Sequence, residues 1–310
     1  MDSVPIIDLS SSSAAVDLVD GLERASSALL VGHGIDLDLR RRVIATAREF
    51  FALPRGQKAE VQWSGTGLWY GWQPVNEGGP EYSADRAPDL VERFELSGDP
   101  SAFEAWPAEP SGFVEAWTAY YRACAGLASR LVTMAAGVLD LPADDLTAWT
   151  NEQFANLVAN HYPAQPVPPL PGQTRVAAHT DRGGITLLAA DEAPGGLEVR
   201  LGERTWTPVV IPDDAYVVQV GDLFSRWTNK RIPANVHRVV NPPRAVAATA
   251  SRLALVYFHY PRLDAVIAPA PSCIGDAGTR FQPISAIQHT LYRQEAYRTR
   301  GDNDYAMAGS

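Results

Sequence analysis

Short apolar runs rich in β-branched residues dominate the second half of the chain, and turns rich in Gly, Pro and Asp separate them. Runs of this kind are typical of β-strands, and strands that follow one another without intervening helices favour a sandwich or a jelly roll. We expect eight strands, over residues 154–162, 176–179, 185–189, 197–200, 206–210, 215–220, 236–240 and 253–260. The pattern therefore predicts a double-stranded β-helix, or cupin-like jelly roll, over residues 151–265.

The first half of the chain predicts helices instead. Apolar residues recur every three or four positions over residues 15–29, from Asp36 to Pro54, and over 111–140, which is the spacing of one helix face. A polar, amphipathic segment over residues 282–299 predicts a C-terminal helix. We expect a mainly β protein with flanking helices (α+β), divided into residues 1–150, 151–265 and 266–310 within one structural unit.

One pair of residues at the end of the predicted strand 176–179 suits metal binding. His179 and Asp181 are separated by one residue, and in an extended chain residues i and i+2 point to the same face. His237 lies in another predicted strand. Two imidazoles and one carboxylate can hold a divalent metal on one face, leave other coordination positions open, and suit Fe(II). An ordinary polar turn is the alternative interpretation of the His-Thr-Asp tripeptide.

Other histidines and one aspartate compete for the same role. Asp222, in a Gly-Asp-Leu sequence, is more typical of a turn whose carboxylate caps backbone N–H groups. His161 and His259 alternate with neighbours expected to face the cavity, so they should point away from it. His33 lies in a Gly-rich turn and His289 on the C-terminal helix.

The motifs along the chain resemble those of the isopenicillin-N-synthase-like group of iron(II)/2-oxoglutarate dioxygenases. They follow the order of the family and cover nearly the whole chain: residues 5–9 (PIIDL), 31–35 (VGHGI), 49–54 (EFFALP), 160–163 (NHYP), 178–181 (AHTD), 185–188 (ITLL), 195–199 (GGLEV), 220–223 (VGDL), 237–239 (HRV) and 252–258 (RLALVYF). The His-Arg-Val context favours His237 as the second histidine ligand.

This resemblance implies an enzyme that uses Fe(II), 2-oxoglutarate and O2 to hydroxylate or desaturate a small organic molecule, with biosynthesis of a specialised metabolite as the expected role. Succinate and CO2 would be the co-products. His179, Asp181 and His237 would hold the iron. Residues 1–150 would cap the substrate site. The carboxylate of Asp181 excludes the usual halogenase arrangement, in which a small residue leaves room for a halide.

The resemblance also implies a binding site for 2-oxoglutarate. Arg252 would pair with its distal carboxylate, with Tyr162 and Asn160 close by. The chain departs from the family at one position, because Ala254 replaces the serine of the Arg-x-Ser motif. Arg252 can still make a charge-assisted, bidentate contact. One lost neutral hydrogen bond is worth about 0.5–1.5 kcal/mol, so we expect weaker binding of 2-oxoglutarate but not its loss.

The residues expected to contact substrate are mostly aromatic. By resemblance, Phe94, Phe258 and Tyr260 face the substrate. Arg182, directly after the ligand Asp181, would add a cation near the metal. An aromatic group in the Gly-rich stretch 64–80 forms either a lid or ordinary packing on the core; its members are Trp69, Tyr70 and Trp72.

Two other functions stay open from the sequence. Ala254 allows an iron oxidase of the same family that works without 2-oxoglutarate and forms a ring in a four-electron oxidation. The second open function is a non-catalytic binding module on a degenerate scaffold. The intact set of two histidines and one aspartate argues against the module.

Composition narrows the expected partners. The net charge of −10 over 310 residues argues against nucleic acid and anionic membranes. We find no uninterrupted run of about 18 apolar residues and no N-terminal signal pattern. Two cysteines make no disulfide framework, and Cys124 fits a buried apolar position. We therefore expect a cytoplasmic enzyme, a monomer or weak dimer, that binds a small-molecule substrate.

Overall fold

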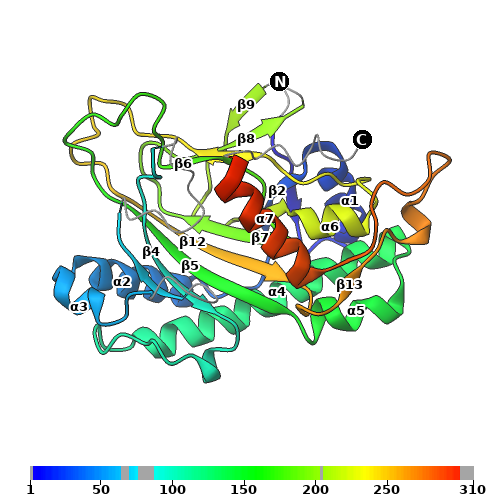
Figure 1. Cartoon of the computed structure of the whole chain (residues 1–310), viewed down its shortest axis with the longest axis horizontal. Coiled ribbons are helices and arrows are strands. Elements are labelled where there is room, and N and C mark those ends of the chain that lie inside the picture. Colours follow the sequence, from blue (N-terminus) through cyan, green and yellow to red (C-terminus); the bar gives the residue numbers. More distant parts are fainter. Residues whose placement is uncertain (1–2, 64–69, 76–86, 203–204, 301–310) are drawn as a thin grey trace.

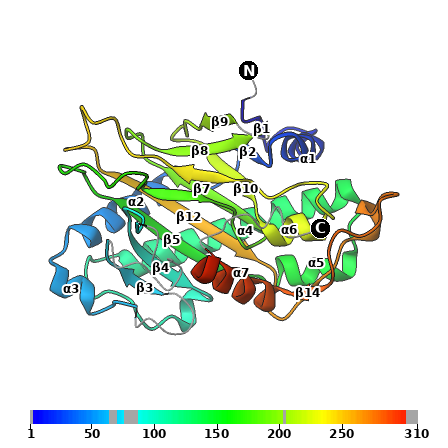
Figure 2. The ribbon, with the colours of Figure 1, turned by 45° about the horizontal axis from the view of Figure 1, so that its top comes forward.

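A computed structural model describes residues 3–63, 70–75, 87–202 and 205–300. Two antiparallel sheets form a jelly-roll core (Figures 1 and 2). The larger has the order β1 (Ile6–Asp8), β2 (Ser27–Val31), β10 (Tyr216–Val220), β7 (Ile185–Ala190), β12 (Arg252–Tyr260), β5 (Phe154–Tyr162), β4 (Glu92–Ser97), β3 (Gly71–Gln73), with only the β1–β2 pair parallel. The smaller has the order β6 (Val176–His179), β11 (His237–Val239), β8 (Leu197–Leu201), β9 (Thr205–Pro208). β13 (Val266–Ile267) and β14 (Ile284–Ser285) pair separately.

Helices cover the outer face of the larger sheet, and one helix lies at its inner face. The helices are α1 (Ala14–Ala25), α2 (Leu37–Ala52), α3 (Arg55–Ala59), α4 (Phe113–Leu139), α5 (Ala143–Thr150), α6 (Asp222–Trp227) and α7 (Ala286–Arg300), with two short 3₁₀ turns at Pro100–Ala102 and Pro271–Cys273. α4 packs against α1, α2, α5 and β12. The red helix α7 crosses in front of the strands in Figure 1.

The alternation of residues along the central strands produces two cores. On β5, Leu157 and Ala159 belong to the core that includes the buried face of α4. Val256 and Ala254 of β12 belong instead to the core shared with the smaller sheet. Successive strand residues point to opposite faces, so residues 154, 156, 158, 160 and 162 of β5 all line one cavity between the sheets.

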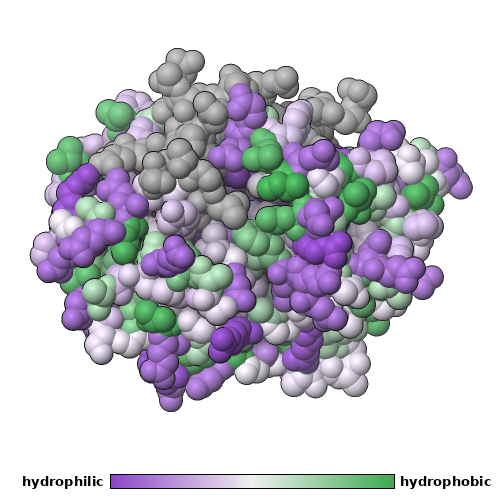
Figure 3. All heavy atoms as spheres, turned by 60° about the horizontal axis from the view of Figure 1, so that its bottom comes forward, coloured by the Kyte–Doolittle hydropathy of each residue, from purple (hydrophilic) through white to green (hydrophobic). Residues whose placement is uncertain are grey.

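The long helix α4 is the scaffold helix that its apolar periodicity predicts. It is long and apolar enough to cross a membrane by length and composition alone. Thirteen of its residues are buried against the rest of the protein, among them Trp117, Tyr120 and Cys124. Figure 3 shows the side of the molecule at the bottom of Figure 1, and hydrophilic and hydrophobic residues are interspersed over much of it. A core helix accounts for the apolar composition of α4.

The eight predicted strands are confirmed, with shifts of one or two residues at some ends. The predicted helix 15–29 is wrong in its last four residues, because α1 ends at Ala25, Ser26 adopts a left-handed backbone (φ 53°), and residues 27–31 form β2. Burial of Ala28 and Leu30 in the sheet outweighs their helix propensity. Residues 1–150 also contribute four strands to the larger sheet. Cys124 and Cys273 are free thiols.

Candidate metal centre

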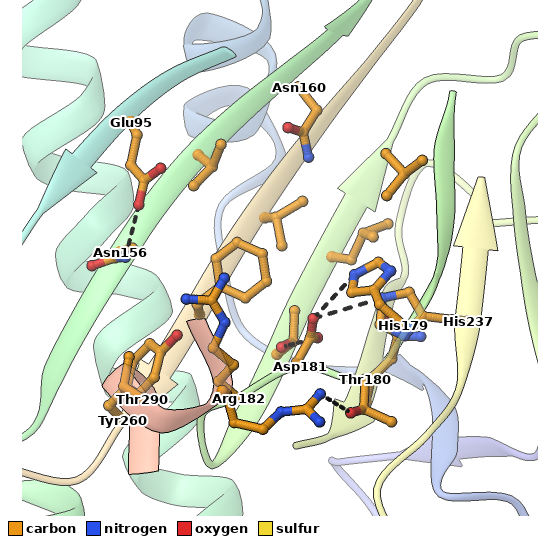
Figure 4. A pocket seen from close by; sticks show the side chains of 18 of the residues that line it. Glu95, Asn156, Asn160, His179, Thr180, Asp181, Arg182, His237, Tyr260 and Thr290 are labelled. Atoms are coloured by element: carbon orange, nitrogen blue, oxygen red, sulfur yellow. Dashed lines mark hydrogen bonds and ion pairs between the residues drawn. The ribbon is translucent and has the colours of Figure 1, made fainter. Parts of the chain in front are cut away.

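His179, Asp181 and His237 meet at one wall of the cavity. His179 ends β6 and His237 begins β11, where the two residues are cross-strand partners. The Oδ1 atom of Asp181 lies 3.6 Å from Nε2 of His179 and 3.7 Å from Nε2 of His237. One donor atom from each residue lies within 4.8 Å of the other two. Figure 4 shows the three side chains converging on one point, which is the arrangement that one metal ion requires.

Backbone carbonyls fix the orientation of both imidazoles. Nδ1 of His179 lies 2.8 Å from the carbonyl oxygen of Ala177, and Nδ1 of His237 lies 3.3 Å from that of Asn235. A carbonyl oxygen can only accept, so Nδ1 carries the proton in both rings. Each Nε2 therefore lies on the side of Asp181, and it can bind a metal there when it carries no proton.

The protonation of the three side chains suits a cation. Burial raises the pKa of Asp181, but the two imidazoles and a hydrogen bond from Thr186 outweigh it and lower the pKa to about 2. Burial and the neighbouring His179 lower the pKa of His237 to about 4. Burial also lowers the pKa of His179, but the hydrogen bond and charge of Asp181 outweigh it, so this pKa rises. The carboxylate is thus charged and attracts one positive charge into the centre.

Close backbone contacts hold the turn that carries Asp181. The N–H of Asp222 donates to the carbonyl of Asp181 at 2.8 Å, and that of Gly221 donates to Gly184 at 2.8 Å. A Cβ atom on Gly221 would lie 2.4 Å from the carbonyl oxygen of Gly183. Glycine at position 221 lets the end of β10 pack directly on this turn, which places Asp181 opposite the two histidines.

Thr186 orients the carboxylate, and its replacement by valine should weaken metal binding. Its Oγ1 donates to Oδ2 of Asp181 at 2.5 Å, in a site where Thr186 is only 2% exposed. Loss of such an outer partner typically lowers metal affinity about 10- to 100-fold. We expect a loss of this size for Thr186→Val in a competition titration of Fe(II) against a chromogenic chelator. Thr205→Val, at an exposed position on β9, is the control, and equal affinities in both variants would contradict this role.

A cavity of about 560 Å³ opens beside the three metal-binding candidates, a volume within the usual range for small-molecule sites. Among the residues predicted for the site, the structure places Asn160, Tyr162, Arg182, Phe258 and Tyr260 in its lining. Strands β5, β7 and β12 contribute apolar side chains to the lining, among them Phe154, Val158, Leu188 and Val256, alongside polar ones such as Asn156 and Thr186. A largely apolar cavity that contains a metal centre suits oxidation of an organic molecule away from water.

Arg252 is absent from the lining of this cavity, but its cross-strand partner Tyr162 lines it. Arg252 is 6% exposed, and its Nη1 donates to the carbonyls of Asp191 and Ala193. The fully buried Arg175 lies near Tyr162 as well, with its guanidinium 5.4 Å from the centre of the tyrosine ring. Neither Arg252 nor Arg175 forms an ion pair within the described part of the chain, and the Nε atom of each lacks a hydrogen-bond partner there. The end of the cavity at Tyr162 therefore favours an anion.

Phe94 does not occupy its predicted place, and for Trp72 and Tyr70 the structure shows packing, one of the two alternatives that the sequence left open. Phe94 is fully buried in an aromatic cluster with Phe50 and Trp117, because it points to the helix side of β4 while its neighbours line the cavity. Trp72 belongs to no lid, since it is 2% exposed and its indole donates to Glu92. Tyr70 is absent from the cavity lining and packs edge-on to Phe103. Trp69 lies outside the described residues.

The competing histidines have other partners, as predicted. His161 points away from the cavity to Glu92, and His259 is buried with its Nε2 2.7 Å from the carbonyl of Trp149. The prediction that the Asp222 carboxylate caps backbone N–H groups is wrong. Asp222 begins α6, and its Oδ2 lies 3.0 Å from Nε of Arg293 and 3.5 Å from Nε2 of His289, both on α7.

Sequence reasoning missed several polar residues of the cavity. Arg93 and Glu95 of β4 and Asn156 of β5 line it, as does Arg293 of α7. For β4 the signal was available, because alternation around the buried Phe94 places both neighbours on the opposite face. No sequence signal assigned α7 to the cavity wall, since that depends on how the C-terminal segment folds back over the sheet.

Comparison with known proteins agrees with this geometry. The sequence profile of the 2OG-Fe(II) oxygenase superfamily matches residues 153–261, and that of the non-haem dioxygenase N-terminal region, described from morphine synthesis, matches residues 4–117. Validamycin A dioxygenase from Streptomyces hygroscopicus subsp. limoneus is 32% identical over 94% of this chain and 86% of its own length. Naringenin,2-oxoglutarate 3-dioxygenase from Arabidopsis thaliana is 29% identical over 96% and 82%.

A solved structure shows the same fold. A full-length protein from Neurospora crassa, crystallised with alpha-KG, is 27% identical and superposes with a TM-score of 0.81 over 94% of this chain and 96% of its own. The profiles together span the jelly roll and the N-terminal region, and the metal-binding candidates lie within the first. This chain belongs to the 2OG-Fe(II) oxygenase superfamily and is a non-haem dioxygenase that uses Fe(II) and 2-oxoglutarate.

Proposed function

We propose that the enzyme hydroxylates or desaturates a small organic molecule in the biosynthesis of a specialised metabolite, with succinate and CO2 as co-products. One observation carries this proposal. The cavity that His179, Asp181 and His237 line has apolar side chains over part of its wall, and its lining includes Tyr162, the cross-strand partner of the buried Arg252. Such a cavity has separate places for an anionic cosubstrate and an organic substrate beside one metal.

His179, Asp181 and His237 are the residues that we propose as iron ligands. Two neutral imidazoles and a carboxylate on one face are the donor set that non-haem Fe(II) oxygenases use. Bound Fe(II) with 2-oxoglutarate and O2 supplies the oxidation of a substrate C–H bond. The protein holds the ligand orientations through Ala177, Asn235 and Thr186 and leaves the remaining face open to the cavity.

Arg252, with Tyr162 and Asn160, is the proposed site for 2-oxoglutarate. The unpartnered Nε atom of Arg252 and the buried charge of Arg175 next to it support a carboxylate partner at this end. Tyr162 and Asn160 line the cavity directly. Ala254 lies on the same face of β12 as Arg252. Its methyl group cannot donate the hydrogen bond that the serine of the family motif would supply there.

Phe258, Tyr260 and Arg182 are the proposed substrate contacts. The two aromatic rings come from the same face of β12, and Arg182 follows the ligand Asp181. The relatives support a small substrate, since their names refer to validamycin A and naringenin, and the Neurospora crassa protein has also been crystallised with thymine. We also propose that the enzyme works in the cytoplasm as a monomer or weak dimer, without nucleic acid or membrane.

The proposed reaction is tested by the fate of 2-oxoglutarate. Purified protein with Fe(II), O2, 2-oxoglutarate and a panel of small ring compounds should form succinate, and one compound should gain oxygen or lose two hydrogens in mass spectrometry. Protein that forms no succinate with any compound, and that shows no visible charge-transfer band with 2-oxoglutarate under anaerobic conditions, would contradict the proposal. Succinate formation without the charge-transfer band would contradict the proposed iron centre.

Replacement of Arg252 should separate this function from an oxidase that does not use 2-oxoglutarate. Hydrogen bonds to charged groups contribute about 1.5–3 kcal/mol, so Arg252→Met should weaken 2-oxoglutarate binding by about 10- to 100-fold. Ala254→Ser should tighten it by up to about tenfold. The anaerobic charge-transfer band gives both affinities. Arg42→Met, at an exposed position on α2, is the control, and unchanged affinity in Arg252→Met would favour the other oxidase.

A further inference from the structure

Two buried carboxyl groups besides that of Asp181 line the cavity, Asp89 and Glu95. Asp89 lies 3.8 Å from Nη2 of Arg93 and accepts a hydrogen bond from the N–H of Ala177, whereas Glu95 forms no ion pair within the described residues. Glu95 of β4 is 4% exposed and lines the cavity, and Figure 4 shows it on the opposite side from His179, Asp181 and His237. The alternation of β4 explains this direction, because Phe94 next to it is buried on the helix side. None of the proposed iron or 2-oxoglutarate contacts uses Glu95, so its presence needs another explanation.

Glu95 has neutral partners only. Its Oε1 accepts a hydrogen bond from Nδ2 of Asn156 at 2.7 Å, and its Oε2 accepts one from Nε2 of Gln73 at 3.4 Å. No lysine or arginine among the described residues forms an ion pair with it. Arg93, on the same face of β4, directs its Nε to Asn160. Burial raises the pKa of Glu95 to about 7, although the charge of Arg93 and the amide hydrogen bonds oppose this rise. A buried carboxylate without a cationic partner is unfavourable.

A second acceptor next to Glu95 also lacks a donor. Oδ1 of Asn156 is buried and has no hydrogen-bond partner in the part of the chain that the structure describes. Its Nδ2 is already bound to Glu95, which fixes Oδ1 as the acceptor that remains. Buried acceptors are normally satisfied. A carboxylate and an amide oxygen side by side therefore match a group with at least two N–H donors and a positive charge.

The surroundings add selectivity for such a group. Phe154, Val158 and Phe258 make part of the neighbouring wall apolar, although Arg93 and Arg182 also line the cavity. Tyr260 lies close enough for the charge of Glu95 to raise its pKa, after the larger effect of burial. An ammonium group between a carboxylate and aromatic rings has favourable electrostatic contacts with both.

We propose that Glu95 and Asn156 bind a protonated primary or secondary amine of the substrate and so direct an adjacent C–H bond toward the metal centre. This inference rests on the proposed function, because it assumes that the cavity beside the iron ligands receives the substrate. It assigns the substrate class as an amine-bearing small molecule and assigns Glu95 as the residue that selects it.

A matched pair of probes tests the proposal. Cyclohexylmethylamine and cyclohexylmethanol differ only in the charged amine, and isothermal titration calorimetry on anaerobic protein loaded with Fe(II) and 2-oxoglutarate measures both. We expect wild-type protein to prefer the amine by about tenfold or more, the usual size of a charge-assisted contact. Glu95→Gln should remove that preference and change alcohol binding by less than about twofold. Glu115→Gln, at an exposed position on α4, changes the net charge equally and should keep the preference.

The outcomes separate this inference from the proposed function. The charge-transfer band with 2-oxoglutarate reports on the iron centre without any amine, so its absence in wild-type protein contradicts the proposed function itself. A normal band without amine preference in wild-type protein overturns the role of Glu95, and this result needs no variant to fold. A normal band in Glu95→Gln that still prefers the amine overturns it as well.

Discussion

Asp181→Ala is expected to abolish iron binding and succinate formation. Asp181 supplies the only negative charge among the three candidate ligands, and its pKa of about 2 keeps it ionised at working pH. Loss of an outer partner alone typically lowers metal affinity about 10- to 100-fold. Loss of a direct ligand should exceed that range, because it leaves two imidazoles to hold the metal. Elemental analysis of dialysed protein and a coupled succinate assay measure the two effects.

The control for this prediction is an aspartate away from the site. Asp276 lies in an exposed turn, so Asp276→Ala should retain both iron and activity. Asp181 is 5% exposed and lies beside two imidazoles. Its replacement by alanine therefore removes a buried negative charge from the metal-free protein. We therefore expect Asp181→Ala to stay folded. Iron content equal to wild type in the folded variant would show that another carboxylate completes the centre.

The strands and the metal-binding triad were predictable from the sequence because their signals are local. Strand β5 has the predicted limits, 154–162, and alternates between two faces along its length. His179 and Asp181 are two residues apart, so their common direction follows from extended geometry. His237 required knowledge of the family motif, since a strand pattern alone does not state which strand pairs with β6.

The residues that the sequence placed wrongly or left undecided depend on contacts between distant segments. Trp72 and Phe94 are aromatic residues that suit either a substrate wall or a core, and the register of β3 and β4 on the sheet places both in buried packing. The strand β2 replaced the end of a predicted helix because it pairs with β10, far along the chain. No local sequence pattern predicts the contact of α7 with Asp222.

Asp222→Asn is expected to destabilise the protein by about 3–5 kcal/mol, the usual effect of removing one partner of a buried ion pair. Asp222 and Arg293 are 4% and 5% exposed, and their Oδ2 and Nε atoms lie 3.0 Å apart. Burial lowers the pKa of His289 beside them, although the charge of Asp222 opposes this. The histidine is then neutral, and the charges of Asp222 and Arg293 balance. The asparagine variant would remove the carboxylate that lies 3.0 Å from Nε of the buried Arg293.

This contact also connects the C-terminal helix with the metal centre. Nη2 of Arg293 donates to Oγ1 of Thr180 at 3.0 Å, between the two ligands His179 and Asp181. Helix α7 supplies Ile287, Thr290 and Arg293 to the cavity wall.

Urea unfolding measures the loss of stability in Asp222→Asn, and hydrogen exchange of α7 shows whether the helix separates first. The double variant Asp222→Asn/Arg293→Met should be more stable than Asp222→Asn, because it also removes the buried positive charge that Asp222 balances. A single variant within about 1 kcal/mol of wild type, with α7 still protected, would show that the pair holds neither the helix nor the cavity wall.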